Sequence, residues 1–430
     1  MVKKDLAFGT DSSIVVKSCQ ICDFGKLETI LFLGYLPPVN TMPKIGSRPI
    51  EQSSYPAEWL YCPKCHLIQL GVVVDPKILF PAEYPYTSST TKVLRDNFAE
   101  LYRESSKLLS LDKKDLIVDI GSNDGNLLSN FKDKHRVLGI TPEEIGKLAI
   151  ERGIDTIIDF FTAQIVAKVI KEKGKAKLIT ATNVFAHMEN LHGVVANILK
   201  LMKKDGVFIS ESHYLYSLIK TLQYDTIYHE HLRYYSLYSL KYLLEMHGLE
   251  VFHAKRIPSH GGSIRVYAAR KGVYKVMPTV SKMLKLEKTI VNSKKSLLDF
   301  RKKVILSKLE ILSLFSKIKS KNKTIYGIGA PSRASTLINY VGIDDGILDC
   351  VLEIKGSHKI GKYVPGTIIP VLNEAVLYKN QPDYALLLSW HIADEIALKI
   401  RDNGFRGDFI VPLPVPRILK VSSKPEKVNN

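Results

Sequence analysis

The sequence predicts an α/β protein of several domains built around an open parallel sheet. Three observations lead to this prediction: two CxxC pairs near the N-terminus, a hydrophobic strand that runs into a glycine turn near residue 120, and strands that alternate with helices again after residue 323. A chain of 430 residues is also too long for one small core. We therefore expect a small metal-binding domain followed by two larger α/β units.

The composition is that of an ordinary globular protein, with 45% hydrophobic and 24% charged residues. No apolar run is long enough to span a bilayer, and the first residues, MVKKDLAFGTDSS, lack the apolar core of an export signal. We therefore expect a cytoplasmic protein that contacts no membrane. The net charge of +18 would favour an anionic partner such as a diphosphate. The lysines are widely spread and no arginine-rich stripe or stacked-aromatic module accompanies them, so we expect no nucleic acid.

Four of the five cysteines form two pairs, Cys19 with Cys22 and Cys62 with Cys65. A gap of two residues lets both thiolates of a pair point at one ion, and two pairs supply the tetrahedral sulfur set that zinc prefers. Four protein ligands leave no open position, so we expect a structural zinc. The prolines between the pairs predict a loop, in which the metal replaces a hydrophobic core. The fifth cysteine, Cys350, lies in an apolar run and is expected to be an inert buried thiol.

The segment DLIVDIGSNDGNLL is the second strong signal. Its first half predicts a buried parallel strand, and Gly121 and Gly125 bracket a tight turn before a helix expected from Asn126 to Phe131. Glycines in such a turn let the backbone approach a ligand closely. The GxxxG spacing differs from the GxGxxG of dinucleotide sites, and Asp119 and Asp124 place negative charge at the loop. This combination favours S-adenosylmethionine over NAD.

The strands that follow are predicted to end in polar residues. RVLGIT ends at Thr141, where an acidic partner of the ribose is usual, and Glu143 and Glu144 lie just beyond it, so the ribose contact stays open. DTIIDFF ends in an acid and two phenylalanines, which suit an adenine amino group and ring face or form a buried aromatic pair.

A fourth strand, AKLITAT, leads to Asn183 and His187. The carboxyl ends of parallel strands line the ligand crevice of an open sheet, so these polar side chains are candidates for it. A histidine at a strand end is also common as a structural residue. The expected cofactor contacts are Asp119, Gly121, Asn123, Asp124, Gly125, Asn126, Thr141, Asp159, Phe160, Phe161 and Asn183.

The run Tyr228-His229-Glu230-His231 places four polar side chains side by side. Buried ionisable groups cost free energy when they are unpaired, so such a run indicates either a ligand site or a solvated turn. In a helical turn Tyr228 and His231 share a face, whereas in an extended segment His229 and His231 do.

The last third predicts a helix from Ser239 to His247 and two strands separated by HGGS, whose glycines permit a ligand approach or a tight hairpin. A lysine- and leucine-rich helical stretch follows from 277 to 319. The strand, glycine turn and helix near Gly327 would seat a phosphate or serve domain packing.

Taken together, these motifs resemble the S-adenosylmethionine-dependent sugar-nucleotide C-methyltransferases, which act on nucleoside-diphosphate 4-keto-deoxysugars. The resemblance covers nearly the whole chain: the CxxC pairs, YPYTSST, DIGSNDGNLL, NVFAH, YHEH, HGGSIRVY, GIGA and KIGKYVPGT. It implies a class I methyltransferase (Rossmann-like) core with a small N-terminal zinc-binding domain and a C-terminal Rossmann-like α/β domain. The expected bounds are 1–80 for the zinc-binding domain, 81–272 for the methyltransferase domain, 273–322 for a helical connector, 323–418 for the sugar-nucleotide-binding domain and 419–430 for a flexible tail.

The resemblance also implies the active-site residues Tyr86, His187, Tyr228, Glu230 and His231. A ketone at C4 makes the C3 hydrogen acidic, and a histidine suits its abstraction, so we expect His231 to be the base. Tyr228 is expected to stabilise the enolate oxygen or return a proton, Glu230 to bind the sugar or orient the base, and the intervening histidine to be a bystander. The expected substrate contacts are His260, Gly262, Ser263, Arg265, Lys362, Tyr363 and Trp390.

Three other functions stay open on the sequence: methyl transfer to oxygen or nitrogen, an NAD-dependent sugar-nucleotide oxidoreductase or epimerase, and a zinc-dependent nucleic-acid-binding module. The expected cofactors are S-adenosylmethionine and a structural Zn²⁺, and the expected partner is a nucleoside-diphosphate sugar. The sequence leaves the oligomeric state open, and a monomer is compatible with it.

Overall fold

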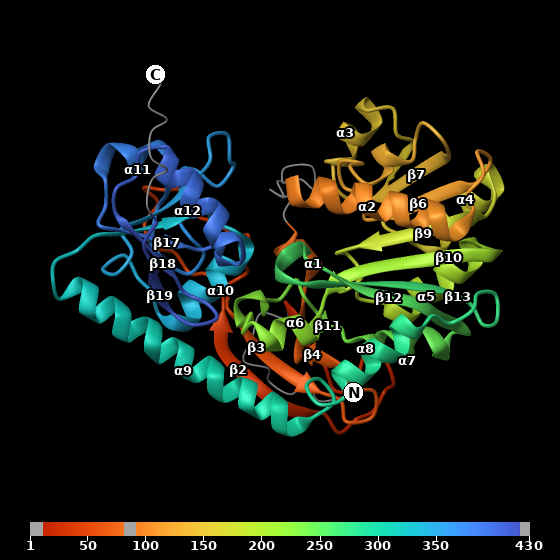
Figure 1. Cartoon of the computed structure of the whole chain (residues 1–430), viewed down its shortest axis with the longest axis horizontal. Helices are drawn as coiled ribbons and strands as arrows, with labels where there is room; N and C mark the ends of the chain where they lie inside the picture. The colour runs from red at the N-terminus through yellow and green to blue at the C-terminus, as the bar shows by residue number, and fades with distance from the viewer. Residues whose placement is uncertain (1–11, 81–91, 422–430) are drawn as a thin grey trace, which may run out of the picture.

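The computed structural model describes residues 12–80 and 92–421. Tyr86 and most of the expected tail lie outside these residues. The described residues form three parts: a small N-terminal domain, a large α/β unit, and a C-terminal α/β unit that the long helix α9 (Lys294–Lys319) connects to the rest (Figure 1). Within these ranges, no helix combines the length and the apolar composition that crossing a bilayer requires.

The N-terminal domain contains an antiparallel sheet, so the loop expected between the cysteine pairs is wrong for much of its length. Its strands are β2 (Glu28–Leu36), β3 (Tyr55–Tyr61), β4 (Ile68–Leu70) and β11 (Arg233–Tyr234), in the order β11-β4-β3-β2, and β1 (Ser13–Val15) pairs with β5 (Val72–Val74), which leads into α1 (Pro76–Leu79). Along β3, buried and half-buried side chains alternate, which is the period of a strand with one face in a core.

This domain also has an apolar core, which corrects the expectation that a metal replaces one. Trp59 on β3 is fully buried, stacks on Phe300 of α9 at a ring-centroid distance of 5.5 Å, and lies 4.7 Å from the ring of Tyr234. The partners of Trp59 therefore come from segments more than 170 residues further along the chain, counted from position 59 to positions 234 and 300. The prolines between the cysteine pairs indicated a loop because the rings that pack against Trp59 are too distant in the sequence to be recognised from this segment.

The two CxxC pairs converge on one point. In each pair, the N–H four residues after the first cysteine donates to that cysteine's carbonyl oxygen at 2.9 Å, which closes a tight turn. All four Sγ atoms lie within 4.8 Å of one another, and Cys19 Sγ is 3.3 Å from Cys65 Sγ. This separation is too long for a disulfide, whose S–S bond is about 2.05 Å. Four thiolates at this spacing fit a zinc ion with Zn–S bonds of about 2.3 Å.

The central unit is a seven-stranded sheet in the order β12-β13-β10-β9-β6-β7-β8. Its strands are β6 (Leu116–Ile120), β7 (Arg136–Thr141), β8 (Thr156–Ile158), β9 (Ala176–Thr182), β10 (Met202–His213), β12 (Leu249–Ile257) and β13 (Ser263–Arg270). The strands from β10 to β8 are parallel, whereas β13 is antiparallel to both of its neighbours.

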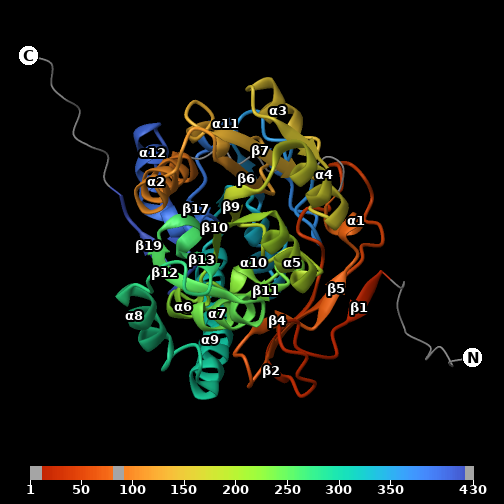
Figure 2. The ribbon, with the colours of Figure 1, turned by 90° about the vertical axis from the view of Figure 1, so that its right-hand side faces the viewer.

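Helices cover both faces of this sheet, as the fully apolar character of a buried parallel strand predicts. Ile117 of β6 belongs to the core that includes α2 (Lys92–Leu109), while its neighbour Val118 belongs to the core that includes α4 (Ala163–Lys173) and α5 (Leu191–Leu201). Figure 2 shows α2 on one side of the sheet and α4 and α5 on the other. The remaining helices of this unit are α3 (Gly146–Glu151), α6 (Leu215–Lys220) and α7 (Leu237–Met246).

The helix expected from Asn126 to Phe131 is only a short 3-10 turn, η2 (Leu128–Asn130). Ser129 Oγ donates to the Gly125 carbonyl oxygen at 3.0 Å, and Asn130 Nδ2 donates to the Asn126 carbonyl oxygen at 3.1 Å. Serine and asparagine side chains compete in this way with regular backbone hydrogen bonds. The segment is apolar because its side chains pack against α2, and this apolar character suggested a helix.

The C-terminal unit follows α8 (Pro278–Glu287) and α9. It is a six-stranded sheet in the order β16-β15-β14-β17-β18-β19, in which only β19 is antiparallel among the described strands. Its elements are β14 (Ile325–Ile328), α10 (Ser332–Val341), β15 (Cys350–Glu353), β16 (Val371–Asn373), α11 (Ala375–Asn380), β17 (Tyr384–Leu387), η5 (Trp390–Ile392), α12 (Ala393–Asp402), β18 (Asp408–Val411) and β19 (Arg417–Leu419). This is the second strand–helix alternation that the sequence predicts.

Replacing Cys62 with alanine is expected to lower the zinc content from about one ion per chain to near zero and to lower the melting temperature, because structural zinc sites contribute folding free energy. Elemental analysis and thermal melting of the full chain measure both effects. Cys350→Ala is the matched control, since Cys350 is buried in the C-terminal sheet, outside the cluster. A Cys62→Ala protein that retains its zinc would contradict the four-sulfur site.

Candidate functional site

The turn at Tyr228–His231 is buried. The His231 N–H donates to the Tyr228 carbonyl oxygen at 2.9 Å, which closes the turn. The two rings lie at a centroid distance of 4.1 Å, so Tyr228 and His231 share one face, as a helical spacing predicts. The segment is a turn rather than a helix, and it leads from η3 (Tyr224–Thr226) into β11.

The protonation of His231 follows from its surroundings. Its Nδ1 lies 2.8 Å from the carbonyl oxygen of Thr226. A carbonyl oxygen only accepts, so Nδ1 carries the hydrogen and Nε2 keeps a lone pair. Burial, with a smaller contribution from the neighbouring His187, lowers the pKa of His231 to about 3. The ring is therefore neutral at physiological pH, with the lone pair on Nε2.

Three more histidines surround this ring. His187 follows β9, His213 ends β10, and His260 lies in η4 (Ser259–Gly261). The ring centroids are 5.1 Å apart for His187 and His231, 4.9 Å for His213 and His231, and 5.4 Å for His213 and His260. Burial lowers the pKa of His187 and of His260 to about 4, so these rings are neutral as well.

Sequence reasoning missed His213. Burial lowers its pKa well below the ordinary value of a histidine. His213 ends β10, which pairs in parallel with β9. Parallel strands bring their carboxyl ends to the same edge of a sheet. The strand-end signal that pointed to His187 would also have found His213 if β10 had been recognised as a strand.

The two inner residues of the turn contact the N-terminal domain. Glu230 Oε1 accepts a hydrogen bond from Asn40 Nδ2 at 2.6 Å. His229 Nε2 donates to the Tyr55 carbonyl oxygen at 3.1 Å, and its ring lies against the ring of Tyr55. Adjacent histidines of the same turn therefore have different surroundings.

The glycine loop lies at the carboxyl end of β6. Gly121 has a φ of +72°, and a Cβ there would lie 2.7 Å from Val184 Cγ2, so the position requires glycine. Asp119 accepts a hydrogen bond from Thr180 Oγ1 at 2.6 Å, and burial raises its pKa to about 7. The buried Oδ1 of Asn183 has no hydrogen-bond partner within the described part of the chain. An orphaned acceptor beside a glycine cradle fits a ligand with hydrogen-bond donors.

Glu143 supplies the acid that the end of β7 lacks. Its Oε2 accepts hydrogen bonds from Asn123 Nδ2 and from Thr141 Oγ1, both at 3.4 Å. Burial raises the pKa of this carboxyl. The acid therefore lies between the strand end and the glycine loop although it is two positions beyond the strand. A carboxylate there is placed to accept from ribose hydroxyls.

Two residues of the expected cofactor set contact α3 and the residues that follow it. Asp124 Oδ2 forms an ion pair with Arg152 Nη1 at 3.0 Å. At Gly125, a Cβ would lie 2.6 Å from Ile154 Cδ1 and 2.9 Å from Ala149 Cβ. These contacts hold the glycine loop against α3 and the residues just after it.

The end of β8 presents an exposed aromatic ring. Asp159 Oδ1 accepts from the Phe160 N–H at 2.7 Å, Phe160 is 64% exposed, and Phe161 is half-buried. A buried phenylalanine pair is therefore wrong for this position. An accessible ring beside an acid is the arrangement that an adenine contact needs.

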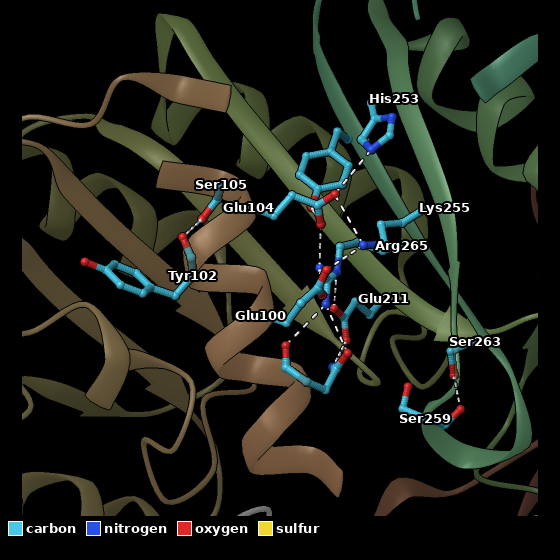
Figure 3. Close-up of polar contacts among 12 residues, drawn as sticks. Glu100, Tyr102, Glu104, Ser105, Glu211, His253, Lys255, Ser259, Ser263 and Arg265 are labelled. Atoms are coloured by element: carbon cyan, nitrogen blue, oxygen red, sulfur yellow. Dashed lines mark hydrogen bonds and ion pairs between the residues drawn. The ribbon is translucent and has the colours of Figure 1, made fainter. Parts of the chain in front are cut away.

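Arg265 lies in a different environment from the one that a substrate contact needs. It is on β13 and 0% exposed, and its guanidinium is paired with Glu211 at 2.5 Å, Glu100 at 2.5 Å and Glu104 at 2.7 Å (Figure 3). Tyr267 also donates to Glu104, at 2.6 Å. The network ties α2, which carries two of the carboxylates, to the sheet. Because these carboxylates occupy the guanidinium, the donors of Arg265 are directed at protein groups.

The other expected substrate contacts lie in several places. Gly262 has a φ of +116° and follows His260 of the histidine cluster. The adjacent Ser263 donates its hydroxyl to the Ser259 carbonyl oxygen at 3.0 Å. Lys362 pairs with Lys44 as an isolated β-bridge.

Two aromatic residues of that set also join domains. The Tyr363 N–H donates to the Pro43 carbonyl oxygen at 2.7 Å, so this loop connects the C-terminal unit to the N-terminal domain. Trp390 Nε1 donates at 2.7 Å to the carboxylate of Asp225 in η3. The C-terminal unit therefore contacts both the N-terminal domain and η3.

Three family models match successive parts of the chain. They describe a zinc binding domain over 19–80, a methyltransferase domain over 92–254 and a C-methyltransferase C-terminal domain over 258–414. The chain is 31% identical to C-methyltransferase NovU of Streptomyces niveus over 415 residues, which cover 95% of this chain and 98% of NovU. The chain belongs to the C-methyltransferase family. Its cofactors are S-adenosylmethionine and a zinc ion held by the four cysteines.

Two solved structures each match less than half of the chain. A SAM-dependent methyltransferase from Anabaena variabilis is 15% identical, with a TM-score of 0.34, over 42% of this chain and 86% of its own. The PH0226 protein from Pyrococcus horikoshii is 15% identical, with a TM-score of 0.36, over 43% of this chain and 95% of its own.

Family membership confirms the resemblance that the motifs indicated and the class I methyltransferase core that it implied. It also decides among the functions left open by the sequence. The chain is an S-adenosylmethionine-dependent C-methyltransferase, rather than an enzyme that methylates oxygen or nitrogen or an oxidoreductase.

Glu143→Gln is expected to weaken S-adenosylmethionine binding about 10- to 100-fold, because a hydrogen bond to a charged group is worth about 1.5–3 kcal/mol. Calorimetric titration of the full chain with S-adenosylmethionine or S-adenosylhomocysteine measures the change. Glu144→Gln is the matched control, since Glu144 is exposed and pairs with Lys147 on the surface. Equal affinities for the two variants would show that Glu143 does not hold the ribose.

Proposed function

We propose that the chain methylates C3 of a nucleoside-diphosphate 4-keto-deoxysugar, through an enolate formed by His231. The single observation that carries this proposal is the buried neutral histidine whose Nδ1–H is fixed by the Thr226 carbonyl. Methyl transfer to carbon needs a carbon nucleophile, and a ketone makes the neighbouring C–H bond acidic enough for a histidine to break.

The proton steps are assigned to residues of the turn. His231 Nε2 takes the C3 proton, and the electrons of that C–H bond form the enolate with its negative charge on O4. Tyr228 is adjacent, and burial raises the pKa of its hydroxyl well above the ordinary value, so it stays a proton donor for the developing oxyanion. S-adenosylmethionine, when bound, supplies the electrophilic methyl group.

The sugar is proposed to lie between the histidine cluster and the N-terminal domain. Glu230 and Asn40 together present a carboxylate and an amide for sugar hydroxyls, and His187 borders the same space. The buried Nδ1 of His187 and Nε2 of His260 have no hydrogen-bond partner within the described ranges. Tyr86 keeps its proposed active-site role from the family resemblance.

The nucleotide is proposed to bind on the side of the substrate site that faces the C-terminal unit. Its proposed contacts are Lys362, Tyr363 and Trp390. On the cofactor side, Glu143 joins the expected set, in which Asp119, Gly121, Asn123, Asn183 and Phe160 surround the ends of β6, β7, β8 and β9. Asp124 and Gly125 are proposed to support this loop through their contacts with α3.

The test of the proposed reaction is product analysis with a nucleoside-diphosphate 4-keto-6-deoxysugar and S-adenosylmethionine. We expect a mass gain of one methyl group and a proton NMR methyl signal on carbon, with loss of the C3 proton. Without S-adenosylmethionine in heavy water, the enzyme is expected to exchange that proton for deuterium, because enolate formation precedes transfer. A methyl signal on oxygen, or no product from such sugars, would exclude this substrate class.

His231→Asn is expected to lower turnover about 10²- to 10⁴-fold, because it removes a general base. S-adenosylmethionine affinity is expected to be unchanged. His229→Asn is the matched control, since the neighbouring histidine faces the Tyr55 carbonyl. Initial rates and calorimetric titration of both variants provide the measurement, and near-normal turnover by the His231 variant would show that another group is the base.

A further inference from the structure

An ion pair joins η3 of the methyltransferase unit to α10 of the C-terminal unit. Asp225 in η3 accepts from Arg333 Nη2 at 2.7 Å and from Arg333 Nε at 2.8 Å. Trp390 Nε1 donates to the same carboxylate at 2.7 Å, and the guanidinium lies 4.9 Å from the centre of the Trp390 ring. The carboxylate thus has three donors, all of which come from the C-terminal unit.

The burial of this pair makes its geometry specific. Asp225 is 0% exposed and Arg333 is 7% exposed. Burying two charges costs free energy that only close pairing and additional hydrogen bonds offset. A bidentate contact from arginine also sets the orientation of the carboxylate. The interaction therefore holds η3 in one position relative to α10.

The residue after Asp225 links this contact to the base. The carbonyl oxygen of Thr226 accepts the hydrogen of His231 Nδ1 at 2.8 Å. On the other side of that carbonyl, Thr336 Oγ1 of α10 donates to the Ile227 carbonyl oxygen at 3.4 Å. Contacts from α10 therefore flank the peptide group that orients His231.

We propose that Arg333 and Trp390 are positioning residues for methyl transfer: by holding Asp225, they place the Thr226 carbonyl that keeps the hydrogen of His231 on Nδ1 and directs Nε2 at the substrate. The C-terminal unit then acts on the proton-transfer step itself, beyond any part it has in holding the sugar nucleotide. This inference rests on the proposed role of His231 as the base.

Direct substrate binding by Arg333 is the competing role. Two of its nitrogens are occupied by Asp225, and the third, Nη1, lies 3.3 Å from His391 Nδ1. A guanidinium held in this way has its donors directed at protein groups. Loss of a substrate contact would raise KM, whereas loss of a positioning contact lowers kcat.

The test compares Trp390→Phe and Arg333→Lys with the native chain. Trp390→Phe removes one hydrogen bond to Asp225 and leaves the ion pair in place. Arg333→Lys keeps the charge but removes the bidentate geometry. We expect kcat to fall about 10- to 100-fold in both, by analogy with the outer-shell partners of metal-ligating histidines, whose loss has effects of this size. S-adenosylmethionine affinity is expected to be unchanged.

The second readout is the ¹⁵N NMR signature of His231, assigned by comparison with His231→Asn. The native chain is expected to show hydrogen on Nδ1, and the two variants are expected to show a mixture of tautomers. Lys308→Met is the matched control, since Lys308 of α9 contacts the Tyr340 ring of α10 and does not contact Asp225. It is expected to keep both kcat and the native signature.

Folded variants with native kcat and a native His231 signature would overturn the proposal. For Arg333→Lys, a rise in KM with unchanged kcat would overturn it as well, in favour of a substrate contact. The NMR experiment reports on the His231 tautomer without turnover. It therefore distinguishes the case in which Arg333 and Trp390 do not position His231 from the case in which His231 is not the base. In the latter case His231→Asn stays active while the tautomer still depends on Arg333 and Trp390.

Discussion

The burial of the histidine cluster is the constraint on which the rest of this structure depends. His187, His213 and His260 surround His231, and burial lowers the pKa of all four rings. A histidine in water would be half protonated near pH 6.5, whereas burial disfavours the charged form and leaves the lone pair of a ring nitrogen free. The histidine rings stay neutral because they are buried, so the domains that surround them are needed to enclose them.

The turn at Tyr228–His231 is held at both ends by different domains. Before the turn, η3 is held by Arg333 and Trp390 of the C-terminal unit. After the turn, β11 pairs with β4 in the sheet of the zinc-binding domain. The zinc cluster stabilises the turns of that domain, and Asn40 and Tyr55 of the same domain contact the turn itself. The N-terminal domain is therefore a structural part of the site.

Buried charges in the described structure join segments that are far apart in the sequence. Arg265 connects β13 to α2 through Glu100 and Glu104, and Asp225 connects η3 to Arg333 of α10. Removing one partner of a buried pair typically costs about 3–5 kcal/mol, because the other charge stays without compensation. Such pairs strongly favour one arrangement of the elements that they join.

The sequence by itself determined the features that have local causes. The CxxC spacing identified the zinc ligands, apolar runs located strands β6 to β9, and the interval between Tyr228 and His231 offered a common face as one of two possibilities. The tertiary structure decided which charges are enclosed and which groups meet: Glu143 at the end of β7, His213 beside His231, Arg265 inside its carboxylates, and Arg333 on Asp225, 108 positions away. The physical reason is that pairing, burial and the resulting pKa depend on neighbours brought together by folding, whereas turn geometry and strand periodicity depend on adjacent residues.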